Sequence, residues 1–406
     1  MYTYKRIAIF TEYFDSSKTS AGQHMTDLTI ELSKNKDFFI DIYTFKNHED
    51  HTVTKKYSEN IKIHRIKNGK KRSSSLFSRA ISEILISFKV YIYIRKHKMH
   101  RSFDNIIWYS PTIFWGPLVM YLKLFNKTKN ILILRDIFPR WAVDLNLIKP
   151  NSIHYYFFRF FELLQYRAAD IIAIQADGNK DFFGSKLRNM SKIITLKTWY
   201  HPVNSLNQIS DAVLKKIPFE DKKICVYAGN LGIAQNQELL LKIVAEINQY
   251  NDDHHFIFIG LKNSDRILVE KLAKKLNLTN FTSIESLSIN ELNAVLDKSH
   301  MGIFSLDSRH TTHNIPGKFL HYISLGIPSF GITNENNDLN LIMKNNNLGN
   351  TYSGHNSKEA AIAFLKLSKQ ISNEEYTKDA IKRYVTVELA PKKAATKIIN
   401  LFNSYI

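Results

Sequence analysis

The sequence of 406 residues contains a single cysteine, Cys225, and lacks long apolar runs. One cysteine excludes an intramolecular disulfide and an all-cysteine metal site, and it favours a reducing, cytosolic compartment. No stretch approaches the roughly 20 uninterrupted apolar residues of a spanning helix, so we expect a protein that is soluble or lies on a membrane without crossing it. The sequence also has no Asp-x-Asp, HExxH or G-x-S-x-G motif. We therefore expect no metal-clamped diphosphate, no zinc peptidase site and no serine nucleophile.

What is present is an ordinary globular composition with an excess of basic residues. Hydrophobic residues make up 44% of the chain and charged residues 23%, enough for a sizeable core. The net charge is +19. Residues 1–210 carry 33 basic and 17 acidic side chains, whereas residues 211–406 carry 23 and 20. The basic half suggests an anionic partner such as phospholipid, nucleic acid or a phosphorylated substrate, although a bias towards solubility would also produce it.

Strand-like apolar runs alternate with helical patterns along nearly the whole chain. This alternation favours an α/β fold of two doubly wound, Rossmann-like parallel-sheet domains facing a cleft. We predict domains at residues 1–203 and 222–385, joined by a linker near 203–222, with a final helix at 391–406 that completes the first domain. The predicted strands are 6–12, 38–45, 61–66, 105–109, 130–134, 170–174, 192–196, 223–228, 255–259, 281–284, 302–306 and 328–332.

The strongest candidate site lies in residues 306–328, LDSRHTTHNIPGKFLHYISLGIP. A strand ends there, a polar loop follows, and Pro316, Gly317 and Lys318 open a helix. Free N–H groups at a helix start suit a phosphate, and Lys318 adds a full positive charge. Arg309, His310, His313 and His321 are close in sequence, which strengthens this interpretation. A solvated lysine beside a Pro-Gly turn remains the simpler alternative.

Glycine-containing turns follow the first strand of each predicted domain. YAGNLGIAQNQ, residues 227–237, places Gly229 and Gly232 between a strand and a helix, and Gly22 occupies a similar turn near the N-terminus. Both turns are weak signals alone, because neither matches a complete dinucleotide or P-loop motif. Their corresponding positions favour a ligand held between the two domains.

Two further segments carry chemical groups of interest. Asp136, in LRDIFPRWAVDLNL, follows a buried strand and is predicted either to act on an acceptor hydroxyl or to cap the next helix. The basic run that contains Lys70, Lys71 and Arg72 precedes an amphipathic stretch with a second basic flank, a pattern typical of a helix lying on an anionic membrane. A solvated helix is the alternative there.

These residues resemble the GT-B glycosyltransferases of family 4. The likeness rests on YAGNLGIAQ and PGKFLHYISLGIP, and the RDIFPRW and SLDSRHTTHNIPGKFLHY segments resemble bacterial L-fucosamine (N-acetyl-L-fucosaminyl) transferases of O-antigen and capsule synthesis. The resemblance implies a retaining, metal-independent transferase with a UDP-sugar donor and no cofactor. It also implies an undecaprenyl-diphosphate-linked saccharide acceptor and a cytoplasmic, peripheral location on the inner face of the membrane.

The resemblance also implies roles for particular residues. Gly22 would lie near the donor phosphate, Asn230 and Gln235 near the diphosphate, and residues 316–318 would form the diphosphate-binding helix start, with Lys318 and Asp136 the catalytic candidates. His313 and His321 stand where many members carry two glutamates, with Asn314 beside the first, and Ile233 and Gln235 stand where the wider family often has Arg and Lys. A histidine cannot bind two ribose hydroxyls bidentately as a carboxylate does, so Lys318 would carry more of the phosphate charge.

Two other functions fit part of this pattern. A nucleotide-sugar 2-epimerase would share the architecture and need no membrane acceptor. A basic nucleic-acid-binding protein would explain the charge, but the sequence contains no recognised nucleic-acid motif.

Overall fold

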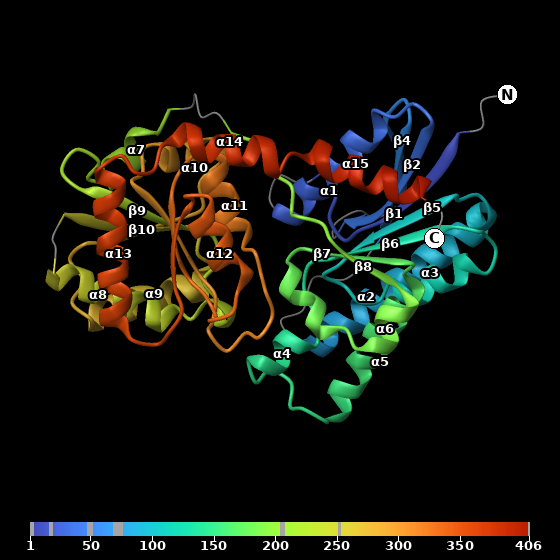
Figure 1. Ribbon diagram of the computed structural model, residues 1–406, viewed down its shortest axis with the longest axis horizontal. Coiled ribbons are helices and arrows are strands. Elements are labelled where there is room, and N and C mark those ends of the chain that lie inside the picture. Colours follow the sequence, from blue (N-terminus) through green and yellow to red (C-terminus); the bar gives the residue numbers. More distant parts are fainter. Residues whose placement is uncertain are drawn as a thin grey trace. The chain divides into compact units, whose positions relative to one another are not determined.

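The computed structural model describes residues 4–15, 19–46, 52–67, 76–203, 208–250 and 253–404. The chain divides into two compact units. The first comprises Met1–Trp199 and Pro391–Ile406, and the second comprises Tyr200–Ala390. Each is an α/β unit with its own sheet (Figure 1).

The first unit contains an eight-stranded sheet in the order β3-β4-β2-β1-β5-β6-β7-β8. All neighbouring strands run parallel except the edge strand β3, which is antiparallel to β4. The strands are β1 (Lys5–Phe10), β2 (Phe38–Lys46), β3 (Val53–Ser58), β4 (Ile61–Lys67), β5 (Asn105–Tyr109), β6 (Lys129–Leu134), β7 (Ile171–Ile174) and β8 (Lys192–Thr195). Since β1, β5, β6 and β7 are buried on both faces, their sequences are nearly continuous apolar runs.

Helices cover both faces of this sheet (Figure 1). On one face, α1 (Ser20–Ser33) packs with α15 (Pro391–Asn403), the helix that returns to this unit from the C-terminus. Ala394, Ala395, Ile398 and Phe402 of α15 join that core at helical spacing. The other face is covered by α2 (Leu76–Lys96), α3 (Gly116–Lys123) and α5 (Ile153–Ala168). Short helices α4 (Arg140–Asp144) and α6 (Ser185–Met190) complete the unit.

The second unit has a six-stranded parallel sheet in the order β11-β10-β9-β12-β13-β14. Its strands are β9 (Lys223–Ala228), β10 (His254–Ile259), β11 (Phe281–Ile284), β12 (Met301–Ser305), β13 (Ser329–Ile332) and β14 (Gly349–Tyr352). Its helices are α7 (Asp211–Leu214), α8 (Gln237–Tyr250), α9 (Asn263–Lys275), α10 (Ile289–Asp297), α11 (Gly317–Ser324), α12 (Asp338–Asn345), α13 (Ser357–Ser372) and α14 (Lys378–Glu388). The cores around α8 and α13 and around α10 and α11 lie on opposite faces of the sheet.

The structure contains two strands that the sequence did not predict. β3 is an exposed edge strand whose sequence, VTKKYS, is mostly polar, and β14 is the four-residue segment GNTY at the edge of the other sheet. Edge strands need little apolar sequence, so a search for apolar runs misses them. The segment near 203–222, which was predicted to be a linker, packs in part against the second unit. Its residues Ile209, Val213 and Ile217 are buried in the core of that unit.

Candidate functional site

The carboxyl edge of the second sheet carries two adjacent glycine turns. Gly229 follows β9 with φ +94°, and Gly260 follows β10 with φ +75°, a backbone conformation that other residues rarely adopt. The Gly229 N–H donates to the Ile259 carbonyl at 2.7 Å, and the Gly260 N–H donates to the Ile284 carbonyl at 3.0 Å. A Cβ on Gly260 would lie 3.9 Å from the backbone of Gly229. The two turns therefore place backbone at this edge, with Cε of Lys318 3.5 Å from where a Cβ on Gly229 would lie and the Ser286 hydroxyl 3.6 Å from where a Cβ on Gly260 would lie.

Helix α11 is held against this edge by Tyr322. The Tyr322 hydroxyl accepts from the Ala228 N–H at 2.9 Å and donates to the Ile303 carbonyl at 3.0 Å. Its ring occupies the space that a Cβ on Gly302 would need, since that atom would lie 2.4 Å from the ring. This arrangement fixes α11 on the sheet, so the start of the helix has a defined position at the end of β9.

Lys318 reaches from the first turn of α11 to the Gly229 turn. Its Nζ donates to the Asn230 carbonyl at 3.0 Å and lies 5.0 Å from the centre of the Tyr227 ring. The Tyr227 hydroxyl donates to the same carbonyl at 2.9 Å. A Cβ on Gly229 would be 3.5 Å from Cε of Lys318, so the lysine stem lies over the glycine.

The start of α11 has the properties of an anion site. Pro316 is its N-cap and has no side-chain group that could accept from the first N–H groups of the helix. Lys318 is partly buried, and burial lowers the pKa of its amine to about 8. A lysine in the first turn opposes the helix dipole, and burial further disfavours its charge. A bound anion would relieve both costs.

The neighbouring loop holds its polar residues in local contacts. Gln235 Oε1 accepts from the Gly232 N–H at 2.8 Å and closes the turn after β9, so its carbonyl supports the loop itself. The Asp307 N–H donates to the Ala234 carbonyl at 2.9 Å and joins this loop to the end of β12. Arg309 donates to both oxygens of Asp307, at 2.8 and 2.7 Å. Burial alone would raise the pKa of Asp307, but the hydrogen bonds from Arg309 outweigh it and lower that pKa.

The structure does not gather the predicted histidines into one cluster. His313 Nδ1 lies 2.9 Å from Asp338 Oδ1 and accepts from the Asp338 N–H at the start of α12. His321 Nε2 lies 2.7 Å from Asn293 Oδ1 of α10, and burial lowers its pKa to about 4. Asn314 uses its carbonyl to accept from Asn337 at 3.4 Å. The proximity of these residues in sequence was therefore misleading, because their side chains face different helices.

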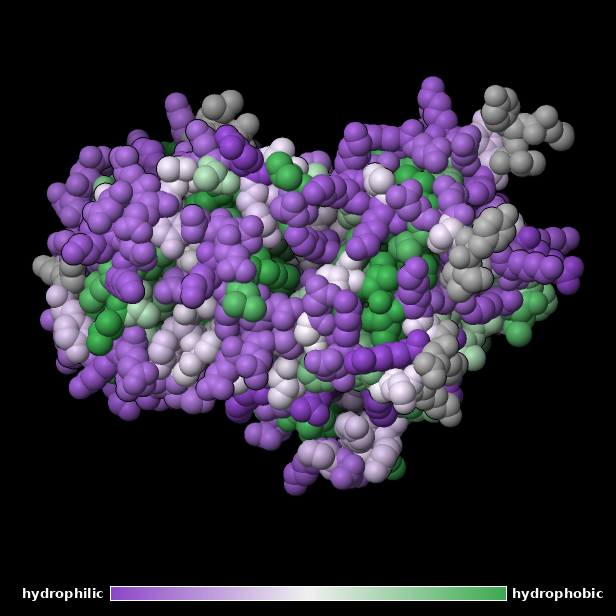
Figure 2. Space-filling view, viewed as in Figure 1, coloured by the Kyte–Doolittle hydropathy of each residue, from purple (hydrophilic) through white to green (hydrophobic). Residues whose placement is uncertain are grey.

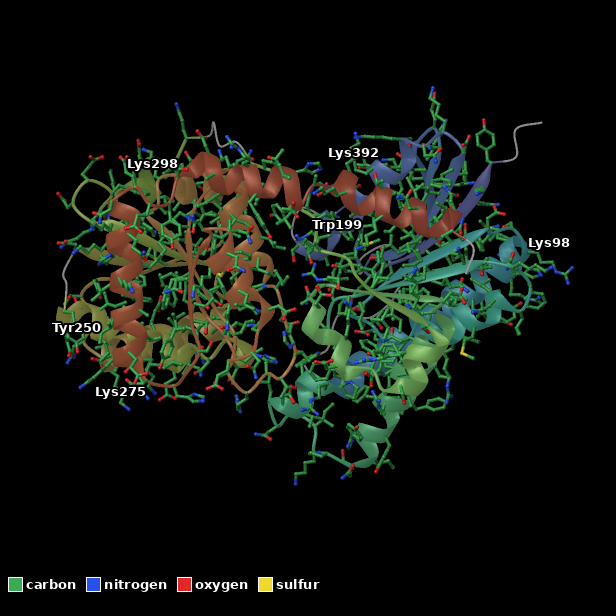
Figure 3. All side chains as sticks on the ribbon, in the orientation of Figure 1. Lys98, Trp199, Tyr250, Lys275, Lys298 and Lys392 are labelled. Carbon is green, nitrogen blue, oxygen red and sulfur yellow. The ribbon has the colours of Figure 1, made fainter. Side chains whose placement is uncertain are left out.

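In the first unit, Gly22 lies buried in the first turn of α1. Its N–H donates to Thr19 Oγ1, the N-cap of the helix, at 3.1 Å. The sequence analysis missed two neighbours of this edge, His24 and Arg135. Arg135 Nη1 lies 2.9 Å from His24 Nδ1, and the indole of Trp199 donates to the His24 carbonyl. Trp199 is labelled in Figure 3. Arg135 directly follows β6, a position that could have drawn attention to it.

Asp136 lines a cavity of about 300 Å³ at the carboxyl ends of β5 and β6. Glu83 of α2 is a second carboxylate in the same wall, and the rings of Phe114, Phe138 and Trp141 form much of the rest. We refer to it as the carboxylate cavity. The capping alternative for Asp136 is wrong, because the N-cap of α4 is Pro139 and no side chain caps that helix.

Of the predicted membrane segment, the structure describes the helix and not the basic run. Lys70, Lys71 and Arg72 lie outside the described residues. Helix α2 contributes Ile86, Val90 and Ile94 to the core on one side. Its other side exposes an apolar row at helical spacing, with 42–56% of each side chain exposed, formed by Ile81, Leu85, Phe88 and Ile92. In the described part of the chain, no helix is both long and apolar enough to cross a bilayer.

Among the described residues, no group of three or more His, Cys, Asp or Glu side chains is placed to hold a metal ion. The visible surface is mostly hydrophilic, with hydrophobic residues in separate patches (Figure 2).

Comparison with known proteins identifies the fold. No protein-family model matches the chain. A probable glycosyltransferase of Pseudomonas aeruginosa, WbjE, is 23% identical over 279 residues, which is 66% of this chain and 65% of WbjE, less than two thirds of that relative. Sucrose-phosphate synthase from Thermosynechococcus elongatus superposes with a TM-score of 0.73 at 13% identity, covering 98% of each chain. An E. coli trehalose-6-phosphate structure bound with UDP-2-fluoro glucose also gives 0.73, at 10% identity, covering 99% of this chain and 100% of the other. The chain therefore has the GT-B fold, as its sequence predicted.

Proposed function

We propose that this protein is a glycosyltransferase that takes a sugar from a UDP-sugar donor. The diphosphate would lie on the glycine turns of the second unit, against the start of α11 and Lys318. The position of Lys318, with its amine 3.0 Å from the Asn230 carbonyl at the Gly229 turn, is the observation that carries this proposal. The similarity to WbjE and to the structure that holds a UDP-sugar analogue supports it.

The chemistry required is stabilisation of a leaving group. When the sugar leaves, UDP develops negative charge, and helix N–H groups that are already oriented, together with the Lys318 amine, would stabilise it. We propose transfer with retention and without a metal ion or cofactor. Asn230 and Gln235 would support the phosphate region through backbone and turn contacts. His313, Asn314 and His321 would act by positioning the loops around α11.

We propose that the acceptor is a lipid-linked saccharide, extended during bacterial surface-polysaccharide synthesis, and that the donor sugar is N-acetyl-L-fucosamine. The protein would lie on the cytoplasmic face of an anionic membrane, with Lys70, Lys71 and Arg72 contacting headgroups. The exposed row on α2, followed by Arg95, Lys96 and the surface residue Lys98 (Figure 3), supports such contact, because an interfacial helix combines an apolar face with basic flanks.

A thermal-shift titration with UDP, UDP-glucose and UDP-N-acetyl-L-fucosamine tests donor binding. A ligand that binds only the folded protein raises its melting temperature, and the stabilisation grows with the logarithm of the ligand concentration relative to Kd. We expect a shift with each uridine diphosphate compound, without added metal, and no shift with uridine. The shift should disappear in Lys318→Ala and persist in Lys275→Ala, an exposed lysine at the end of α9 that serves as the matched control (Figure 3).

NMR of UDP-N-acetyl-L-fucosamine incubated with the protein separates transfer from epimerisation. A transferase leaves the donor sugar unchanged until an acceptor is added, apart from slow hydrolysis. Accumulation of an epimer without acceptor would overturn the proposal in favour of a 2-epimerase.

A further inference from the structure

A second cavity of about 450 Å³ lies next to the carboxylate cavity, and unlike that cavity it has no carboxylate among its described lining residues. Ile84, Ser87, Phe88 and Tyr91 of α2 form one wall, and no charged side chain is among its lining residues in the described part of the chain. We call it the apolar groove. Its volume falls within the roughly 300–1,000 Å³ range of small-molecule sites, and its lining residue Leu118 belongs to the core of the unit.

The two cavities are neighbours in the fold. Phe114 lines both of them, and its ring meets Phe161, a residue of the groove, edge-on at 4.9 Å. Along α2 the lining passes from Glu83 of the carboxylate cavity to Ile84 and Ser87 of the groove within one helical turn. A single molecule could therefore place a polar end beside Glu83 and Asp136 and an apolar end beside Phe88.

Aromatic contacts shape the far end of the groove. The Phe88 and Tyr91 rings stack at 5.9 Å, and Tyr91 meets Tyr121 of α3 edge-on at 4.8 Å. Arg95 donates to the Tyr121 hydroxyl at 3.0 Å, so a cation stands just beyond the apolar lining. Phe88 is 56% exposed, which shows that the groove opens to the surface there.

We infer that the apolar groove binds the hydrocarbon chain of a lipid-linked acceptor whose sugar occupies the carboxylate cavity. This inference rests on the proposed function and names the site of its acceptor. Carboxylate oxygens accept hydrogen bonds from sugar hydroxyls, and aromatic rings provide apolar surface for the faces of sugar rings. The chain would enter from a leaflet whose anionic headgroups match Arg95 and the neighbouring Lys96 and Lys98.

The distance between the two cavities also limits the length of the acceptor's head group. Glu83 and Ser87 are four residues apart on α2, about 6 Å along the helix axis, so only a short head fits between the carboxylates and the groove. The acceptor would carry one or two sugars on its lipid. The reaction that supplies it would therefore be the transfer of a first sugar phosphate from a nucleotide-sugar to the lipid phosphate, with release of the nucleoside monophosphate.

Titrations with methyl, octyl and dodecyl β-glucoside, each below its micellar concentration, test this inference on the whole protein. Each buried methylene strengthens binding by up to about fourfold. We expect the dodecyl compound to bind at least tenfold more tightly than the octyl compound, and the methyl compound to bind too weakly to measure. Equal affinities for all three would overturn the inference.

Two substitutions in the groove should remove the dependence on chain length. Phe88→Ala removes an exposed wall, and Ser87→Phe fills the interior. Either should weaken dodecyl glucoside binding at least fivefold. Ile92→Ala on the same helix is the matched control, because Ile92 is 48% exposed and is not a lining residue. Because Ser87 is buried, circular dichroism checks the fold of its variant. If the spectrum differs from that of the unmodified protein, Phe88→Ala decides alone.

UDP binding, measured in the same samples, separates the two proposals. If UDP binds but affinity does not depend on chain length, the groove inference fails and the proposed function stands. If chain length matters but UDP does not bind, the proposed function fails instead. If Phe88→Ala binds dodecyl glucoside normally but floats less with anionic vesicles, this face contacts a bilayer and the groove inference is wrong.

Discussion

The carboxyl edges of the two sheets differ in the residues that occupy them. In the second unit the edge consists of glycine turns, the start of α11 and the Lys318 amine. In the first unit it carries Asp136, and the adjoining cavity is lined by Glu83 and aromatic rings. Backbone N–H groups and a cation suit a diphosphate, whereas carboxylates and rings suit a sugar. The same kind of sheet thus carries different chemical groups at the corresponding edge.

The largest expected effect is on Lys318. Replacing it with alanine removes the charge that we propose stabilises the leaving diphosphate, and the loss of one such group slows a reaction about a hundredfold or more. UDP-sugar turnover with a lipid-linked acceptor measures this effect, with Lys275→Ala as the unaffected control. Near-normal turnover in Lys318→Ala would show that the phosphate does not bind at this edge.

A comparison of two glycines tests how rigidly α11 is held. A Cβ at Gly302 would lie 2.4 Å from the Tyr322 ring, while a Cβ at Gly184 in the first unit meets no atom within 4 Å. We expect Gly302→Ala to lower the free energy of unfolding by about 1 to 3 kcal/mol, and Gly184→Ala to change it by less than about 0.5 kcal/mol. Urea denaturation measures both, and equal effects would contradict the packing of Tyr322 against Gly302.

In the first unit, Asp136→Asn should separate donor binding from transfer. The substitution keeps the shape of the side chain but removes its charge, so we expect transfer to fall about tenfold or more while UDP affinity stays unchanged. Steady-state kinetics and a UDP titration check the two parts. Asp181→Asn, a carboxylate with 89% of its side chain exposed, is the control. A matching loss of UDP affinity would argue against an acceptor role.

A smaller effect concerns pH. Because burial lowers the pKa of Lys318 to about 8, the amine is protonated at neutral pH and loses its charge as the pH rises through that value. A bound diphosphate favours the charged form, so affinity for UDP should be greatest below pH of about 8 and fall several-fold above it. Isothermal titration across this range measures the fall. Lys318→Arg should be insensitive to pH there, because arginine stays charged.

The sequence predicted the architecture well because strands buried on both faces of a parallel sheet have nearly continuous apolar sequences. It missed β3 and β14, whose edge positions require no such run. It predicted a helix start at residues 316–318 from the order of strand, loop and helix, and α11 begins there. It did not foresee that His313 and His321 would face Asp338 and Asn293, because these partners lie on helices more than twenty residues away in the sequence.

The cavities of the first unit could not be predicted for a related reason. Glu83 and Asp136 are more than fifty residues apart, and only the packing of α2 beside the ends of β5 and β6 brings them to one wall. The amphipathic pattern of α2 was visible, but an exposed apolar row and a groove give the same pattern. Only the structure separates Phe88, which lines the groove, from Ile92, which does not.

The most direct test of the central claim is a crystal structure of the protein with UDP. The account predicts that the diphosphate lies at the start of α11, within hydrogen-bond distance of the N–H groups of residues 317–319 and of the Lys318 amine. A diphosphate bound elsewhere, with Lys318 still on the Asn230 carbonyl, would contradict it.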